Sequence, residues 1–309
     1  MLLIKNTWAG FRYRHWTLLA ALTYFLKGVA RETNIFSNFF MECHRKVVCR
    51  QFKKKWLKQS GEARYFSFNG AKFPDISADK YNFCGLASYV FEDTFFIPCY
   101  HNDNHDKTLV ERLDRYMHEG PYGYVDGAFN VTVREDDIVI DAGAWLGDFS
   151  AYAASKNATC YAFEPVVANF RTLCETAELN KPYIFPVQKG FGSEECELNI
   201  SVPASTSASS FIMFHENGQI ETVQITTLDK FVEENKLSKV DFIKADIEGA
   251  ERDMLLGATN VLKTFAPKLA ICTYHLPDDP HVLEKIILDA NPNYTVRHLR
   301  HKLFAMVIK

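Results

Sequence analysis

The stretch that decides the fold is Asp137-Ile138-Val139-Ile140-Asp141-Ala142-Gly143-Ala144-Trp145-Leu146-Gly147. It reads as a short β-branched strand that ends in Asp141 and enters a turn bearing Gly143 and Gly147. A second apolar strand, Thr159–Glu164, also ends in a carboxylate. A strand, a glycine turn, a helix and a second strand tipped by an acid form the first half of a nucleotide-binding α/β fold, in which that acid accepts hydrogen bonds from ribose hydroxyls.

The spacing of the glycines distinguishes between adenosine-containing ligands. A dinucleotide fingerprint, G-x-G-x-x-G, cradles a pyrophosphate at a helix N-terminus. Counted from Gly143, the second and third glycine positions hold Trp145 and Asp148, and a bulky indole and a carboxylate are poor neighbours for a pyrophosphate. The pattern D-x-G-x-x-x-G instead favours the cationic amino-acid portion and sulfonium of S-adenosylmethionine, although a glycine turn that serves packing alone would look the same.

Composition and charge set broad limits. A chain of 309 residues, 47% hydrophobic and 24% charged, is an ordinary globular protein with room for one large or two modest domains. The net charge is only −3, but residues 1–60 hold 12 Lys and Arg against two acids, so that they carry about +10 and the rest about −13. The eight cysteines form no C-x-x-C pair, and we expect a reducing, cytoplasmic compartment.

Residues 1–105 are expected to form a basic, helical N-terminal region of unknown role. The run Trp16–Leu26 is apolar over only about eleven residues, short of the ~20 that a membrane-spanning helix needs. Apolar residues at four-residue spacing predict a helix over Phe40–Leu57, and Gly61 is a candidate stop. The basic surface suits peripheral contact with an anionic membrane, or attraction to the acidic remainder within the chain or a homodimer. We expect no nucleic-acid partner.

Residues 106–309 are expected to form the domain that binds the cofactor. From Asp137 onward strands and helices alternate regularly, which predicts a mostly parallel sheet covered on both faces. The last two strands are joined by only three residues, so they must be antiparallel. The predicted fold is a Rossmann-like, class I methyltransferase α/β fold with a seven-stranded sheet and one antiparallel strand at its end. The expected strands are 138–141, 159–164, 183–189, 240–245, 269–274, 294–299 and 303–308, with a hairpin at 197–202 and 220–225; the expected helices are 108–118, 148–155, 168–179, 228–235, 250–256 and 281–289.

Titratable residues gather where the parallel strands end, and this is the edge at which open α/β sheets bind ligands. The segment Ile243–Glu251 places three acids around a glycine, directly after a strand and at the start of a helix. Helix capping would explain one of these acids, but not all three. His275 follows the next strand, and Arg300 and His301 follow the sixth.

Several short motifs match a known family. They are Asp137–Phe149, Ala162–Pro165, Thr227–Asp229, Ile243–Glu251, Tyr274-His275 with Pro277–Asp279, and Leu299–His301. On these residues, the chain from about Tyr122 onward resembles the FkbM-type S-adenosylmethionine-dependent methyltransferases. The resemblance implies a class I methyltransferase fold and O-methylation, often of sugars or other hydroxylated natural products, and it implies nothing about residues 1–105.

The candidate site residues follow from the strand edge and the turn. The expected cofactor-binding residues are Asp141, Gly143, Trp145, Gly147, Glu164 and Asp246, and the expected substrate-binding residues are Glu248, Arg300 and His301. His275 is the first candidate for the base, because a histidine can be neutral near pH 7, and Asp246 is the second catalytic residue. Asp246 could also be the base, or could orient the cofactor or the acceptor. Asp246, Glu248, His275 and His301 could assemble a metal site, but their spacing has no ligand pattern and no metal is predicted.

The sequence therefore predicts an S-adenosylmethionine-dependent methyltransferase that methylates a hydroxyl, with a sugar or glycan intermediate as the expected acceptor. A nicotinamide-dependent sugar oxidoreductase is the alternative enzyme, against which Trp145 and Asp148 argue. A non-catalytic binding or scaffold protein on the same fold is the third hypothesis.

Overall fold

A computed structural model describes residues 37–79, 82–83, 85–87, 99–100, 122–202, 219–299 and 301–308. Three sequence predictions lie outside the described residues: the apolar run Trp16–Leu26, the helix at 108–118, and Arg300. Among the described helices, none combines the length and the apolar character that crossing a membrane requires.

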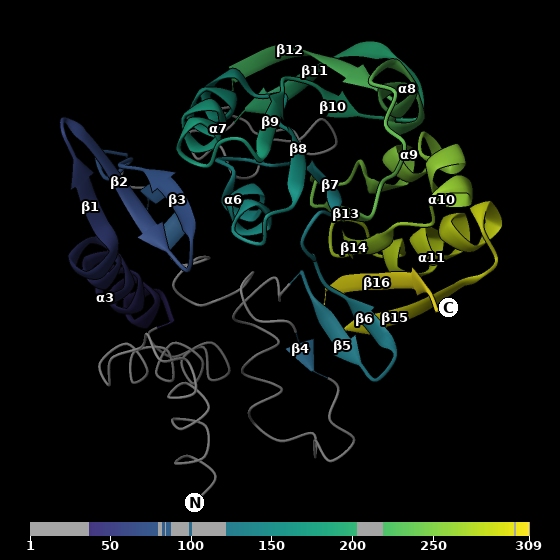
Figure 1. The fold of residues 1–309 in the computed structure, drawn as a ribbon, viewed down its shortest axis with the longest axis horizontal. Helices are drawn as coiled ribbons and strands as arrows, with labels where there is room; N and C mark the ends of the chain where they lie inside the picture. Colours follow the sequence, from purple (N-terminus) through teal and green to yellow (C-terminus); the bar gives the residue numbers. More distant parts are fainter. Residues whose placement is uncertain are drawn as a thin grey trace, which may run out of the picture.

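A seven-stranded sheet forms the centre of the fold (Figure 1). Six of its strands are parallel, and β16 runs antiparallel to both of its neighbours, which confirms the predicted class I methyltransferase topology. In spatial order the strands are β15 (Tyr294–Leu299), β16 (Lys302–Val307), β14 (Lys268–Cys272), β13 (Phe242–Ala245), β7 (Ile138–Ala142), β8 (Thr159–Phe163) and β9 (Ile184–Val187).

Two cores lie on opposite faces of this sheet, because successive side chains of a strand point to opposite faces. In β7, Val139 packs with α6 and α7, whereas the next residue, Ile140, packs with α8 to α11. Figure 1 shows α10 and α11 beyond the sheet on the side away from α3 and β1–β3. The helices are α6 (Asp148–Ala154), α7 (Val167–Leu179), α8 (Leu228–Glu234), α9 (Glu251–Leu256), α10 (Thr259–Thr264) and α11 (Asp279–Ala290).

The predicted hairpin between β9 and α8 is confirmed. It consists of β11 (Cys196–Val202) and β12 (Gln219–Thr226), and β12 also pairs with the short β10 (Gly190–Phe191). Ile200, Val202, Val223 and Ile225 pack with Val166 into a small third core. This core lies beside the edge at which the parallel strands end.

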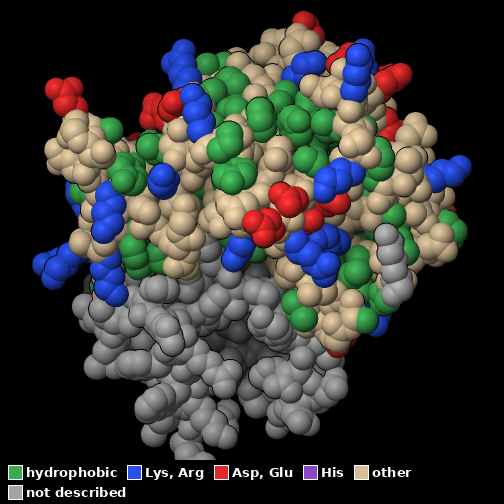
Figure 2. Space-filling model, in the orientation of Figure 1, with side chains coloured by type: hydrophobic (Ala, Val, Ile, Leu, Met, Phe, Trp, Pro, Cys, Tyr) green, Lys and Arg blue, Asp and Glu red, His purple; other side chains and the backbone are tan. Residues whose placement is uncertain are grey.

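The N-terminal part contains the expected helix and a small sheet that the sequence analysis did not predict. The helix α3 (Ser37–Trp56) is followed by β1 (Leu57–Ser60), β2 (Ala63–Phe68) and β3 (Ala71–Pro74). Phe52 of α3 packs on Phe66 of β2 with the ring centroids 4.7 Å apart, and both rings belong to the same core as Phe149 of α6. Figure 2 shows Lys and Arg side chains along the outer surface of this part. The remaining strands are β4 (Cys99–Tyr100), β5 (Tyr124–Asp126) and β6 (Phe129–Val131).

Candidate active site

The glycine turn after β7 is shaped by a close approach of two backbones. Gly143 has a φ of 74°, and a Cβ there would lie 2.0 Å from the backbone oxygen of Asp246. Gly147 has a φ of 86°, and a Cβ there would lie 2.8 Å from Leu173 Cδ1. Both positions therefore require glycine, Gly143 to let two strand ends meet and Gly147 to let α6 pack on α7.

Glu164 caps the end of β8 and holds the glycine turn. Its carboxylate accepts hydrogen bonds from the backbone N–H of Trp145 (3.0 Å) and of Val166 (2.9 Å), and from Asn169 Nδ2 (3.3 Å). Burial raises the pKa of Glu164 to about 7, against the opposing effect of these three donors. A buried carboxylate at this strand end is the expected acceptor for ribose hydroxyls.

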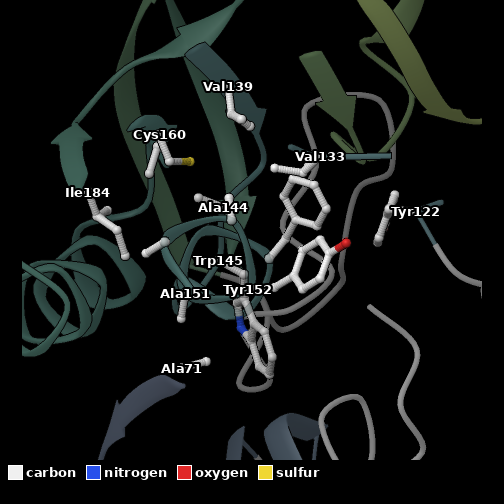
Figure 3. Packing of buried hydrophobic residues seen from close by; sticks show 14 of the residues in the cluster. Ala71, Tyr122, Val133, Val139, Ala144, Trp145, Ala151, Tyr152, Cys160 and Ile184 are labelled. Atoms are coloured by element: carbon white, nitrogen blue, oxygen red, sulfur yellow. The ribbon is translucent and has the colours of Figure 1, made fainter. Parts of the chain in front are cut away.

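Trp145 contributes its backbone to the site and its ring to packing. The indole lies against the N-terminal part, where a Cβ on Gly85 would come within 3.0 Å of Trp145 Cη2. Figure 3 shows the ring pointing toward the segment that carries Ala71. The N-terminal part thus packs against the side chain of Trp145, while Glu164 binds the backbone N–H of the same residue.

Asp141 is fully buried and acts through its neighbours. Ser150 Oγ donates to Asp141 Oδ2 (2.6 Å), and Lys244 Nζ lies 3.0 Å from Asp141 Oδ1. The same ammonium donates to the carbonyl of Gly143 (2.6 Å). Burial alone would lower the pKa of Lys244, but Asp141, Asp246 and Asp148 raise it above its ordinary value, so Lys244 is charged. Lys244, held by Asp141, therefore positions the backbone carbonyls of Ala142 and Gly143.

Asp246, at the end of β13, is held by two tyrosines. Tyr122 Oη donates to Asp246 Oδ2 (2.7 Å), and Tyr274 Oη donates to Asp246 Oδ1 (3.0 Å). Burial by itself would raise the pKa of Asp246, but the nearby Lys244, Lys302 and His275 lower it to about 2. The carboxylate is therefore ionised at every physiological pH.

His275 lies among three carboxylates. Its Nε2 is 3.7 Å from Asp246 Oδ1 and 3.5 Å from Glu248 Oε2, while its Nδ1 is 3.1 Å from Glu251 Oε1. Burial alone would lower the pKa of His275, but Glu248, Glu251 and Asp246 raise it to about 10. The three carboxylates therefore favour the protonated ring where no other cation is bound beside it. The role of His275 as the base stays a prediction.

A pocket opens between the ends of β7, β8 and β13. It spans about 600 Å³, including space open to solvent. Among its lining residues are the following predicted site residues: Gly143, Trp145, Glu164, Asp246 and Glu248. His275 contacts Asp246 and Glu248 at its edge. His301 is exposed, with its ring centroid 6.0 Å from that of Tyr274.

Sequence reasoning missed three residues of this site: Lys244, Tyr122 and Tyr274. Lys244 gave a signal, because it interrupts the apolar run of β13, and a buried lysine needs a partner. Tyr122 gave none, since it comes from a segment far from Asp246 in the sequence, whereas Tyr274 directly precedes His275 in one of the family motifs.

Comparisons with known proteins agree with this geometry. Residues 141–296 match the family described as Methyltransferase FkbM domain. The hexuronic acid methyltransferase AglP of Haloferax volcanii is 27% identical over 157 residues, which are 51% of this chain and 64% of that protein. Methyltransferase 1 of Beauveria bassiana is 28% identical over 158 residues, 43% of this chain and 64% of that protein. The chain thus spans slightly less than two thirds of the length of each relative.

A crystal structure of a methyltransferase FkbM from Methylobacillus flagellatus is also similar. It is 23% identical, covers 56% of this chain and 43% of that chain, and superposes with a TM-score of 0.42.

Proposed function

Because the chain belongs to the FkbM methyltransferase domain family, we propose that it methylates a hydroxyl of a sugar or glycan intermediate. Residues 141–296 are a methyltransferase domain, and its methyl donor is S-adenosylmethionine. The observation that carries the proposal is the buried Glu164 at the end of β8, which lines the pocket beside the turn bearing Gly143. The name of the Haloferax volcanii relative supports a sugar as the acceptor.

The residues of the pocket fit this donor. Glu164 offers carboxylate oxygens to ribose hydroxyls, and Phe163, Phe191 and Ile200 offer apolar walls to a purine. Asp246 supplies negative charge on the opposite side, where a cationic amino-acid portion is stabilised. When bound, S-adenosylmethionine supplies an electrophilic methyl group on a positively charged sulfur.

We assign the acceptor hydroxyl to the cluster of Asp246, Glu248 and His275. The hydroxyl loses its proton as its oxygen takes the methyl group, so the site has to hold the hydroxyl in line and receive the proton. His275, Asp246 and Glu248 are the candidate acceptors of that proton, and His275 Nε2 lies 3.7 Å from Asp246 Oδ1 and 3.5 Å from Glu248 Oε2. Arg300 and His301 stay proposals for substrate binding at the outer edge.

Calorimetry with S-adenosylhomocysteine tests the donor site. We expect binding to the full chain, a strong loss in Glu164→Ala, and an unchanged affinity in Glu178→Ala, since the side chain of Glu178 is 68% exposed on α7. No binding, or equal binding in Glu164→Ala, would refute the proposed donor site. Thermal protection by NAD and not by S-adenosylhomocysteine would favour an oxidoreductase.

Turnover with sugar acids and neutral glycosides tests the acceptor. We expect His275→Ala to lower the rate strongly while S-adenosylhomocysteine affinity stays within a few-fold, whereas Asp246→Ala should damage both. Binding of the donor without methylation of any tested sugar would favour a non-catalytic role for the fold.

A further inference from the structure

One cluster at the edge of the pocket combines an imidazole with three carboxylates. Asp246, Glu251 and His275 each offer a ligand atom, and these atoms all lie within 4.8 Å of one another. Glu248 Oε2 adds a fourth candidate, 3.5 Å from His275 Nε2. Three carboxylates surround one ring at a site that is largely withdrawn from water, and Lys244, Lys302 and His275 offset part of the negative charge.

The burial and the hydrogen bonding of His275 indicate that this cluster binds a ligand, which helix capping by its acids would not explain. Its side chain is only 3% exposed, and both ring nitrogens are buried. Among the residues that the structure describes, neither nitrogen finds a partner with hydrogen-bond geometry, although carboxylate oxygens lie 3.1–3.7 Å away. The nitrogens of a buried imidazole normally make hydrogen bonds. The nitrogens of His275 instead lie near carboxylate oxygens without good hydrogen-bond geometry.

The distances suit ligands that share one ion. Two ligands held about 2.1 Å from a tetrahedral ion lie roughly 3.4 Å apart. His275 Nε2 is 3.5 Å from Glu248 Oε2 and 3.7 Å from Asp246 Oδ1, so each carboxylate lies near the distance from the ring that two ligands of one ion would have. One nitrogen and two carboxylate oxygens suit zinc, manganese or iron.

The neighbours of these three ligands match the supporting shell of a metal site. Ligating histidines commonly give their other nitrogen to a carboxylate, and Glu251 Oε1 lies 3.1 Å from Nδ1. Glu251 is itself fixed by the backbone N–H of Ile247 (2.8 Å) and of Gly249 (3.1 Å). Tyr122 and Tyr274 orient the carboxylate of Asp246 in the same way.

We propose that a divalent cation replaces the proton of His275 Nε2 at the edge of the pocket and is bound by this atom, Asp246 Oδ1 and Glu248 Oε2, with Glu251 as a positioning residue. Three protein ligands leave a coordination position open, as catalytic metal sites do. An acceptor hydroxyl bound there would lose its proton more readily, because a metal ion lowers the pKa of a bound water or hydroxyl. This chemical role rests on the proposed methyl transfer, whereas the binding of the ion does not.

Titration of the chelator-treated full chain with Mn²⁺, followed by the electron paramagnetic resonance of free Mn²⁺, tests the site without using activity. We expect saturable binding that Zn²⁺ displaces, since zinc binds such ligands more tightly. His275→Gln and Glu248→Gln should each weaken binding at least about tenfold, and Glu251→Gln about 10–100-fold. If His275→Gln does not fold, Glu248→Gln carries the test, because the Glu248 side chain is 18% exposed and better tolerates replacement.

Two control variants separate this proposal from others. His298→Gln alters an exposed histidine paired with Glu284 (2.8 Å) and should leave Mn²⁺ binding unchanged. Glu164→Gln should weaken S-adenosylhomocysteine and leave Mn²⁺ binding unchanged, so that failure of the donor site and failure of the metal site are distinguishable. Absence of saturable binding, or binding that His275→Gln and Glu248→Gln do not weaken, would overturn the proposal.

Discussion

At the scale of a single residue, the burial of Glu164 favours its protonated form, whereas ribose binding favours its ionised form. Burial raises its pKa to about 7, yet only its ionised form offers both oxygens as acceptors to ribose. The folded protein therefore holds the proton of Glu164 to a higher pH than the unfolded chain does. As a result, the protein without ligand loses stability as the pH rises from about 4.5 to about 7. Ligand binding and folding therefore respond to pH in opposite directions here.

We predict that S-adenosylhomocysteine affinity rises about tenfold from roughly pH 6 to pH 8, because a group with a pKa near 7 ionises over that interval. Calorimetry at several pH values measures this. In Glu164→Gln the affinity should be low and nearly flat with pH. A slope that survives in Glu164→Gln would transfer the effect to another group such as Asp148, whose pKa burial also raises to about 7.

Gly143 allows a matched test of close packing. Gly143→Ala would drive a Cβ against the backbone of Asp246 at a φ of 74°, so we expect a loss of at least about 2 kcal/mol in unfolding free energy. Gly127 has a φ of 58° but open space around its Cβ position, and Gly127→Ala should cost only about 1 kcal/mol. Urea denaturation compares the two; equal losses would mean that the close approach after β7 is unimportant.

At the scale of elements, β7 and β13 are joined by charge as well as by hydrogen bonds. Lys244→Met would leave Asp141 buried without its cation, which typically costs about 3–5 kcal/mol. Adding Asp141→Asn should restore part of the loss. As a control, Lys285→Met breaks the ion pair with Asp289, whose two side chains are 74% and 64% exposed. The urea midpoint of this variant should equal that of the unchanged protein. A small effect of Lys244→Met would show that the pair is dispensable.

The elements that the sequence predicted correctly are those with a clear period. From β7 onward, apolar strands alternate with amphipathic helices. The short link before β16, which the sequence predicted at three residues and which has two, requires the last two strands to be antiparallel. The sheet β1–β3 was missed because its strands are too short, at four, six and four residues, to show a clear period. At the site, the strand-edge rule brings Glu164 and Asp246 to the lining of one pocket. The distances between His275 and its three carboxylates depend on contacts between separate loops, which the sequence does not give.

At the scale of the whole molecule, the N-terminal part and the methyltransferase domain share a core. Asn180, at the end of α7, bridges them: Lys72 N–H donates to its Oδ1 (3.0 Å), and its Nδ2 donates to Lys72 O (2.7 Å). The boundary near residue 105, and a role of residues 1–105 in acceptor access or association, stay predictions. The shared core means that a chain beginning at Lys107 loses packing against Trp145 and should be much less stable, even where its donor site is intact.

Asn180→Ala probes this connection in the full chain. It removes both bonds to Lys72 and one to Thr176 O (2.7 Å), so we expect a loss of about 1–3 kcal/mol in unfolding free energy. As a control, Asn235→Ala removes one hydrogen bond at the end of α8, from Asn235 Nδ2 to Phe231 O (2.9 Å), and should lower the unfolding free energy less than Asn180→Ala does. Because the side chain of Asn180 bonds to Lys72 and Thr176 and not to Gly143 or Glu164, S-adenosylhomocysteine affinity should stay within a few-fold in both variants. A large fall in affinity in Asn180→Ala alone, measured by calorimetry where the protein is fully folded, would mean that the N-terminal part shapes the donor pocket.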